Sequence, residues 1–99
     1  MGNDAKMMVG TLRLRLIIRG ARSLKDKRRS VKSFKDRVRN RFNASVAEVE
    51  ALEAYQTAVL GVAVVGNDTD YVKSVLAKIV RLAAGTRDAE LIDCKMEMR

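Results

Sequence analysis

The chain has 99 residues, a formal net charge of +8, one cysteine and no histidine. A chain of this length forms one domain with a single modest core, and a lone cysteine excludes an internal disulfide and fits a reducing compartment. Without histidine there is no His-based nucleophile activation, general base or metal site, so we expect neither catalysis nor a metal or other cofactor. The sequence shows no apolar run as long as a membrane span and no signal-peptide core, and we expect a cytoplasmic protein.

The first predicted element follows a flexible tail at residues 1–7. Residues 8–19 alternate between apolar and other side chains, which predicts a half-buried strand. Its aliphatic face is formed by Leu12, Leu14, Leu16 and Ile18. Its other face carries Arg13 and Arg15. Gly20 and Ala21 then turn the chain into its most basic stretch.

Residues 22–41 hold ten lysines and arginines against two aspartates, so this stretch alone carries a charge equal to the +8 of the whole chain. Apolar residues recur at helical spacing, which predicts a helix. These residues are Leu24, Val31, Phe34, Val38 and Phe42. Ser23 and Asp26 resemble a capping box at its start, and Asn43 is a candidate left-handed residue at its end.

The basic side chains are not spread evenly around this predicted helix. Six fall on one flank of the apolar stripe: Lys25, Arg28, Arg29, Lys32, Lys35 and Arg39. Arg37 and Arg41 fall on the other flank. Lys27 points close to the apolar side, so either the helix begins near it or its ammonium reaches water from the edge of the core. A face built only for solubility would mix both signs of charge, so we interpret the flank as a binding surface, with a solvated outer face as the alternative.

Two strands are predicted next. Residues 44–50 alternate, and the two faces are Ala47 with Val49 and Glu48 with Glu50. Residues 57–65 are apolar on both faces, which predicts a central strand. The connection at residues 51–56 is predicted to be a loop, and residues 52–54 could instead be helical.

The last two predicted elements are a helix and a strand. Asp68 or Thr69 caps a helix at residues 70–84, and Gly85 ends it as a C′ glycine. Residues 89–98 alternate again, which predicts a final strand. One of its faces is formed by Ile92, Cys94, Met96 and Met98. We expect Cys94 and Met96 to lie in the core.

The order of these elements, β-α-β-β-α-β, predicts an α+β, ferredoxin-like sandwich formed by residues 8–99. Two helices would cover one face of a four-stranded antiparallel sheet with the strand order 4-1-3-2. The open face of the sheet would then carry Arg13, Arg15, Val59, Gly61 and Ala63. An apolar strand face in water suggests a partner surface, and a homodimer through this face is expected. Partial cover of the face by loops or by the tail is the alternative.

Several separate segments resemble the YlxP-like family of small bacterial proteins, and the match runs over about residues 8–98. The segments are Gly20–Arg28, Lys35–Arg37, Asn40–Asn43, Ser45–Glu48, Ala58–Val65 and Asn67–Asp68. The resemblance implies a ferredoxin-like fold, a domain of unknown function and, from the genes that often lie beside it, a ribosome-linked role. It implies no catalytic residues. The chain departs from the family at Arg29-Ser30, which makes the basic run heavier, and at Tyr55-Gln56, where many members carry Trp-Gln.

The basic helix predicts binding of structured RNA, and we expect this RNA to be ribosomal and the protein to be a non-catalytic factor acting in ribosome maturation or translation. Lysines and arginines on a helix can follow phosphates without reading base sequence. The residues predicted to contact RNA are Arg22, Lys25, Lys27, Arg28, Arg29, Lys32, Lys35 and Arg39. The central strands offer no aromatic side chain on which bases could stack.

Two other functions remain open on the sequence alone. The first is a protein-protein interaction module, or a dimeric structural protein, that uses the open sheet face. The second is an anion-binding or acylphosphatase-like enzyme that uses the turn from Arg19 to Ser23, where helix N–H groups favour anions. The glycine-rich acylphosphatase signature is absent from that turn, which favours a simple helix start.

Overall fold

The computed structural model describes residues 6–99, and its elements follow the predicted order βαββαβ. They are β1 (Met8–Ile17), α1 (Leu24–Arg41), β2 (Ser45–Glu50), β3 (Thr57–Gly66), α2 (Thr69–Ala84) and β4 (Glu90–Met98). The connection between β2 and β3 contains turns and no helix, so the helical alternative for residues 52–54 is wrong. Of the predicted tail, residues 1–5 lie outside the described residues, and Lys6 and Met7 precede β1.

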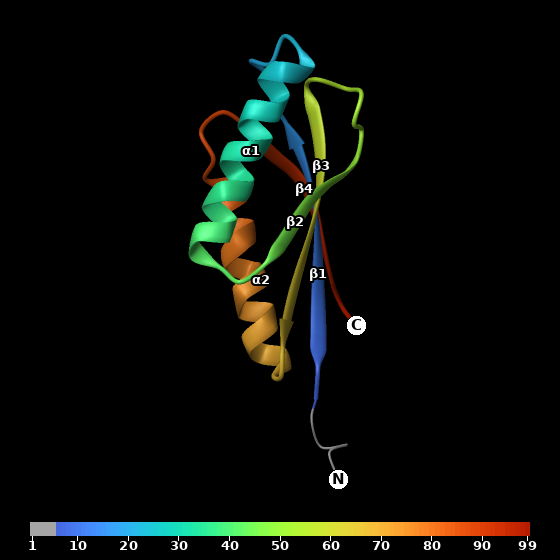
Figure 1. Ribbon diagram of the computed structural model, residues 1–99, viewed down its shortest axis with the longest axis vertical. Helices are drawn as coiled ribbons and strands as arrows, with labels where there is room; N and C mark the ends of the chain where they lie inside the picture. Colours follow the sequence, from blue (N-terminus) through green and yellow to red (C-terminus); the bar gives the residue numbers. More distant parts are fainter. Residues whose placement is uncertain (1–5) are drawn as a thin grey trace.

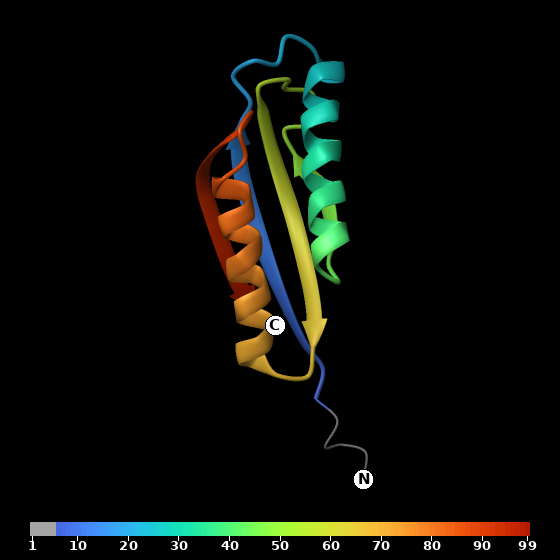
Figure 2. The ribbon, with the colours of Figure 1, turned by 90° about the vertical axis from the view of Figure 1, so that its left-hand side faces the viewer.

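The four strands form one antiparallel sheet in the order β2-β3-β1-β4, as predicted. β1 and β3 pair at its centre in one unbroken register, from Met8 opposite Gly66 to Ile17 opposite Thr57. Both helices lie on one face of the sheet, which Figure 1 shows nearly edge-on. Seen from the helix side in Figure 2, α2 covers the side of β1 and β4, and α1 covers the side of β2. The α+β, ferredoxin-like fold is therefore confirmed.

The core fills the space between the sheet and the two helices. The predicted aliphatic face of β1 is buried, and Leu60 and Val62 of β3 lie beside it. The helices contribute their predicted stripes, which include Val31, Phe34 and Val38 of α1 and Val72, Leu76 and Ile79 of α2. The alternation of two in the strands and the helical spacing in α1 and α2 thus meet in one apolar layer.

α2 approaches β1 closely at Gly10. A Cβ atom at this position would lie 2.6 Å from Cγ1 of Val72 and 2.7 Å from Cδ1 of Leu76. Both of those side chains are completely buried and have little room to move. The missing side chain of Gly10 is therefore what allows the helix to pack directly on the strand.

Both helices begin at side-chain caps, as predicted. The Ser23 hydroxyl accepts a hydrogen bond from the Asp26 backbone N–H (3.1 Å), and the Asp68 carboxylate accepts one from the Tyr71 N–H (3.0 Å). In return, the Asp26 carboxylate accepts a bond from the backbone N–H of Arg22 (2.9 Å). A standard capping box would use the N–H of the cap residue itself, so this version is shifted by one residue.

The predicted left-handed ends of the helices are wrong. α1 ends at Arg41, its C-cap residue Phe42 has an extended backbone, and the one described non-glycine residue with positive φ is Ala51, at 59°. Phe42 packs against the core while the chain continues into β2, so no left-handed residue is needed there. Gly85 does end α2, but its φ is −91°.

The outer strand β4 is more exposed than predicted. Cys94 and Met96 face the helix side of the sheet, since they pair with the buried Leu14 and Leu12 of β1, yet both are exposed. β4 is an edge strand, and among the described residues no second strand lies beyond it. The register with β1 also shifts between Arg15 and Leu16, which leaves Ile92 unpaired and 47% exposed. The prediction that Cys94 and Met96 are core residues is therefore wrong.

Candidate nucleic-acid interface

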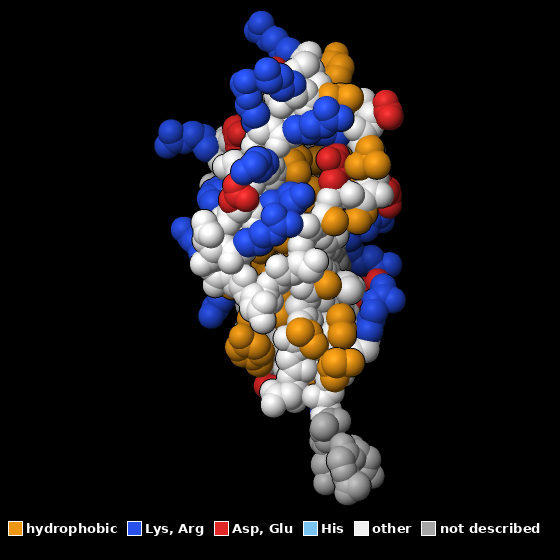
Figure 3. All heavy atoms as spheres, in the orientation of Figure 1, with side chains coloured by type: hydrophobic (Ala, Val, Ile, Leu, Met, Phe, Trp, Pro, Cys, Tyr) orange, Lys and Arg blue, Asp and Glu red, His pale blue; other side chains and the backbone are white. Residues whose placement is uncertain are grey.

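The basic flank of α1 lies on the surface. Lys25, Arg28, Arg29, Lys32 and Arg39 are exposed, Lys35 is half-buried, and Arg22 is exposed just before the helix. We call these seven residues the basic flank. Figure 3 shows lysine and arginine side chains gathered over α1, with only scattered acidic side chains between them.

Little of this charge is neutralised within the molecule. Within residues 6–99, the basic flank makes one ion pair, between Lys32 and Asp36 (2.9 Å), and both partners are exposed. A pair of this kind contributes about 0.3–0.5 kcal/mol and is weakened by salt. Arg39 also donates a long hydrogen bond (3.4 Å) to the Val46 carbonyl, which orients its guanidinium toward β2. The other five members keep their charge available for a partner.

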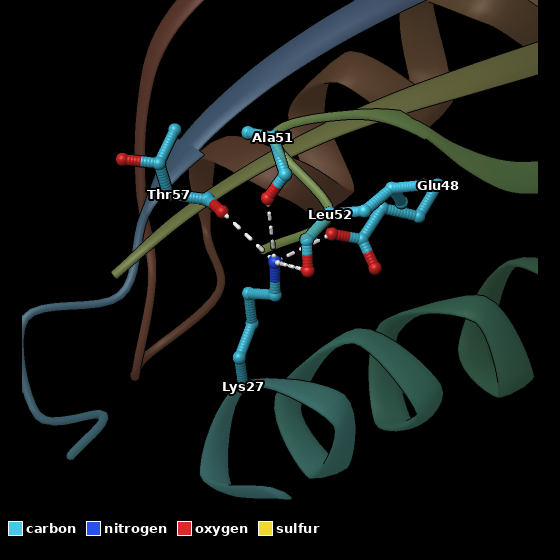
Figure 4. A network of polar contacts seen from close by, with 5 residues as sticks. All are labelled: Lys27, Glu48, Ala51, Leu52 and Thr57. Atoms are coloured by element: carbon cyan, nitrogen blue, oxygen red, sulfur yellow. Dashed lines mark hydrogen bonds and ion pairs between the residues drawn. The ribbon is translucent and has the colours of Figure 1, made fainter. Parts of the chain in front are cut away.

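Lys27 does not belong to this surface. Its side chain is only 1% exposed, and its Nζ lies 2.7 Å from Oε2 of Glu48. The same ammonium donates to the backbone carbonyls of Ala51 (2.9 Å), Thr57 (3.3 Å) and Leu52 (3.4 Å), as Figure 4 shows. All of its donor capacity is used inside the protein, so the prediction that Lys27 contacts RNA is wrong.

The buried Lys27 instead fixes the connection between β2 and β3. Its oxygen partners come from the end of β2, from the following loop and from the first residue of β3. Ala51, with its positive φ, turns its carbonyl toward this ammonium. The helix does begin near Lys27, at Leu24, as one of the two alternatives expected, but the ammonium does not reach water.

Sequence alternation missed Glu48 as the partner of Lys27. Glu48 pairs with Leu60 and lies on the helix side of the sheet with Val46. A bulge follows, because Glu50, and not Val49, is opposite Val59. Glu48 and Glu50 therefore do not share a face, contrary to the prediction. In the sequence, the position of a lysine close to an apolar stripe was the one signal that a carboxylate should lie nearby.

The five residues predicted for the open sheet face all lie on that face. Arg13 is opposite Gly61, Arg15 is opposite Val59, and Ala63 follows along β3. However, Val59 is only 1% exposed, so the prediction that it forms part of an exposed apolar patch is wrong.

Neighbouring side chains explain why Val59 is buried although it lies on the open face. Arg13 of β1 forms an ion pair with Glu50 of β2, and the two side chains therefore span β3. Val49 lies above Gly61, where its Cγ1 would be 3.1 Å from an added Cβ atom. What remains is a shallow hollow of about 460 Å³ with mixed lining, including Thr11, Lys95, Glu97 and Arg99. The exposed apolar strand that motivated a dimer through this face is thus only partly present.

The turn between β1 and α1 borders a second hollow of about 460 Å³. Its lining is rich in acids, with Asp26, Asp88 and Glu90. The polar groups around it already have internal partners, because Ser30 donates to Asp88 (2.7 Å) and Arg19 pairs with Glu90 (2.6 Å). At the start of α1, the Asp26 N–H donates to the Ser23 hydroxyl, and the Asp26 carboxylate accepts from the N–H of Arg22 just before the helix. This arrangement favours a simple helix start over an anion site.

Residues 6–99 contain no group of three or more Asp, Glu, Cys or His side chains placed to hold a metal ion. None of the described helices is long and apolar enough to cross a membrane.

The fold and the surface together define a class of protein: a small ferredoxin-like α+β domain whose surplus positive charge lies on one helix. A family model described as "Protein of unknown function (DUF503)" matches residues 9–96, and the chain belongs to this family. It is 32% identical over 73 residues to "Uncharacterized protein YlxP" of Bacillus subtilis (strain 168), with 74% of this chain and 79% of that protein covered. The YlxP-like resemblance is thereby confirmed.

Solved structures with the same fold include two designed proteins. The de novo designed protein Foldit4 has a TM-score of 0.57 at 14% identity, with 95% of this chain and 97% of that chain covered. The de novo designed protein Ferredog-Diesel has a TM-score of 0.50 at 12% identity, with coverage of 90% and 83%. At these identities the likeness concerns the fold alone.

Proposed function

We propose that this protein binds structured RNA of the ribosome through the basic flank of α1, as a non-catalytic cytoplasmic factor in ribosome maturation or translation. The observation that carries the proposal is the set of basic side chains on one helix that lack acidic partners among residues 6–99. The ribosome as the source of the RNA is supported by the YlxP-like resemblance, which implies a ribosome-linked role.

The shape of the flank suits phosphate binding. Lys25 and Arg39 are separated by fourteen residues, which in a helix correspond to about 21 Å along its axis. The helix is anchored beneath the flank by Val31, Phe34 and Val38, which are all buried. Because the backbone is held in place, several charges can meet phosphates together with little loss of backbone freedom.

This geometry predicts a salt-dependent and sequence-tolerant interaction. If about four to six phosphates are neutralised, log affinity should fall with log salt at a slope of roughly −3 to −5. Base sequence should matter little, because phosphate contacts position a protein without specifying sequence. The affinity should therefore differ less between structured ribosomal RNA and an unrelated folded RNA than it does for one RNA between low and high salt.

The test is a variant in which Arg28, Arg29, Lys32 and Lys35 are all replaced by glutamine. Glutamine keeps the helix propensity, so the variant should fold. We expect much weaker co-sedimentation with ribosomal subunits and their precursors, and a shallower salt slope. The matched control makes the same change to glutamine at four exposed positions on or just after α2, so that both variants lose four charges. These positions are Lys73, Lys78, Arg81 and Arg87.

The comparison between the two variants decides the proposal. If net charge alone mattered, both would lose binding equally. If the flank is only a solvated face, the α1 variant will bind ribosomal particles as well as the parent does, and the proposal fails. Nuclease treatment of captured complexes separates RNA from an acidic protein surface as the partner of the flank, since a protein complex survives RNase.

The second candidate function is a protein-protein interaction module that uses the open sheet face. The exposed Val49 and the hollow of about 460 Å³ that it lines favour it, and Val65 of β3 is exposed as well. Replacing Val49 and Ala63 with glutamate should abolish such an interaction and leave RNA binding unchanged.

A further inference from the structure

The outer edge of β4 carries backbone groups that are free to pair. Val9 and Arg99 exchange both of their backbone hydrogen bonds, with N–O distances of 2.8 and 3.4 Å. Bonded and non-bonded pairs alternate along an antiparallel ladder, so the peptide groups of Cys94, Met96 and Met98 point away from β1. Among residues 6–99, no strand lies on that side of β4. An edge of this kind can accept another strand.

The two edges of the sheet are not equivalent. At β2, the Arg39 guanidinium donates to the Val46 carbonyl, and the chain is bent by the bulge at Val49. At β4, every second exposed side chain is apolar: Ile92 (47% exposed), Cys94 and Met96 (39% exposed). An apolar stripe that runs beside unpaired backbone groups favours a strand as its partner.

The charges along β4 indicate which strand fits. In the segment Ile92-Asp93-Cys94-Lys95-Met96, residues at equal distances from Cys94 are complementary. If two copies of β4 pair antiparallel about Cys94, Asp93 faces Lys95 of the second copy and Ile92 faces Met96 of the second copy. A two-fold axis repeats each contact. We propose that a second copy of this chain docks here, edge to edge through β4, with the axis at Cys94.

Neighbouring registers are disfavoured by charge. In a two-fold symmetric pair of strands, the register can shift only in steps that leave each side chain on the same face of the sheet. One such shift centres the pair on Asp93 and places two aspartates together. The opposite shift centres it on Lys95 and also brings Asp93 against Glu97. Like charges directly opposite each other destabilise a strand pair, so charge favours Cys94 over these two neighbouring centres.

A pair centred on Met96 would also join opposite charges, Lys95 with Glu97 and Asp93 with Arg99 of the second copy. It would not be restored by the charge swap described below, so the experiment distinguishes it from the Cys94 centre.

The remaining geometry is compatible with this dimer. The two sheets would form one eight-stranded sheet with all four helices on the same face. The basic flank lies over the β2 side of the sheet, away from β4, so pairing does not bring these charges together. The contact is confined to a short stretch after the bulge at Ile92. Such a contact is smaller than the roughly 1,200 Å² of a stable interface, so we expect a weak, concentration-dependent dimer. This inference does not rest on RNA binding.

The test is a charge swap. Sedimentation equilibrium from about 1 to 500 μM should show reversible dimerisation of the parent. Lys95→Asp places two carboxylates opposite each other at both symmetric positions and should weaken the dimer roughly tenfold. This variant should fold, since position 95 is beside Arg13 of β1. Asp93→Lys combined with Lys95→Asp restores opposite charges and should restore dimerisation.

Cross-linking at the native cysteine gives an independent reading. A short bis-maleimide should join two chains through Cys94 in the parent but far less in the Lys95→Asp variant, with circular dichroism confirming that each variant is folded. The inference is overturned by a parent that stays monomeric at all concentrations, by a dimer that is insensitive to Lys95→Asp, or by a folded swap variant that does not dimerise again. A dimer insensitive to Lys95→Asp but broken by Val49→Glu would move the contact to the open sheet face.

Discussion

At the residue scale, Lys27 shows how a single charge can change its role with position on a helix. Lys25 and Arg28 lie within one turn of it and are exposed, whereas Lys27 is buried. The difference follows from angle, since Lys27 is one turn before Val31 on the apolar stripe. A buried ammonium is tolerated only with partners, and here Glu48 and three carbonyls supply them.

Lys27→Met should therefore destabilise the protein strongly. The change leaves the Glu48 carboxylate and several carbonyls buried without a donor, and the loss of one partner from a buried pair typically costs about 3–5 kcal/mol. Urea unfolding should show this loss in the free energy of unfolding. Lys25→Met, at an exposed position two residues earlier, should change it by less than about 0.5 kcal/mol. Similar values for the two variants would mean that the Lys27 network contributes little.

At the element scale, the fit of α2 on β1 depends on Gly10. Gly10→Ala would place a methyl group against Val72 and Leu76, and overpacking of this kind costs roughly 1–3 kcal/mol. Gly20→Ala is the matched control, because a Cβ atom there meets nothing within 4 Å. Thermal unfolding should show a clear decrease in Tm for Gly10→Ala only. An equal response at both positions would show that the α2–β1 contact can adjust.

Element order and the N-terminal helix caps could be predicted from the sequence, because they depend on local patterns. The strand order followed from the usual arrangement of a βαββαβ fold. The caps at Ser23 and Asp68 are set by one side chain and the turn that follows it. The errors concern features that depend on neighbours in space. The bulge at Val49 changed the face of Glu50, the Arg13–Glu50 pair contributed to covering the sheet above Val59, and the edge position of β4 exposed Cys94. No periodicity within one segment reports on these events.

For the candidate site, the sequence predicted the side of the helix on which the basic flank lies but not the surroundings of Lys27. The helical period placed the members of the basic flank on one side of α1, and the structure brings them together there. The period also placed Lys27 near the apolar stripe, but the depth at which it is buried depends on Glu48 and on the loop after β2. Long-range partners of this kind have no signature in a single sequence.

At the scale of the whole molecule, the surplus charge is concentrated on one helix, so electrostatic repulsion is local. Six like-charged pairs among the flank residues within α1 are three or four residues apart. They are Lys25 with Arg28 and Arg29, Lys32 with Arg28, Arg29 and Lys35, and Lys35 with Arg39. Each pair destabilises a helix by a few tenths of a kcal/mol. A helix selected for stability alone would carry fewer of them, which favours a functional reason for their presence.

The glutamine variant of Arg28, Arg29, Lys32 and Lys35 should consequently be more stable than the parent while binding RNA less well. Removing all six repulsive pairs should raise the free energy of unfolding by about 1–2 kcal/mol at low salt, less the small contribution of Lys32–Asp36. Added salt screens the same repulsion, so the parent should gain stability between about 0.01 and 0.5 M NaCl and the variant should gain much less.

The control variant at Lys73, Lys78, Arg81 and Arg87 removes a single closely spaced pair within α2, Lys78 with Arg81, and should gain less than the α1 variant. Urea unfolding at the two salt concentrations measures all three proteins. Equal salt responses would mean that the flank is not under repulsive strain and that its charge does not oppose stability.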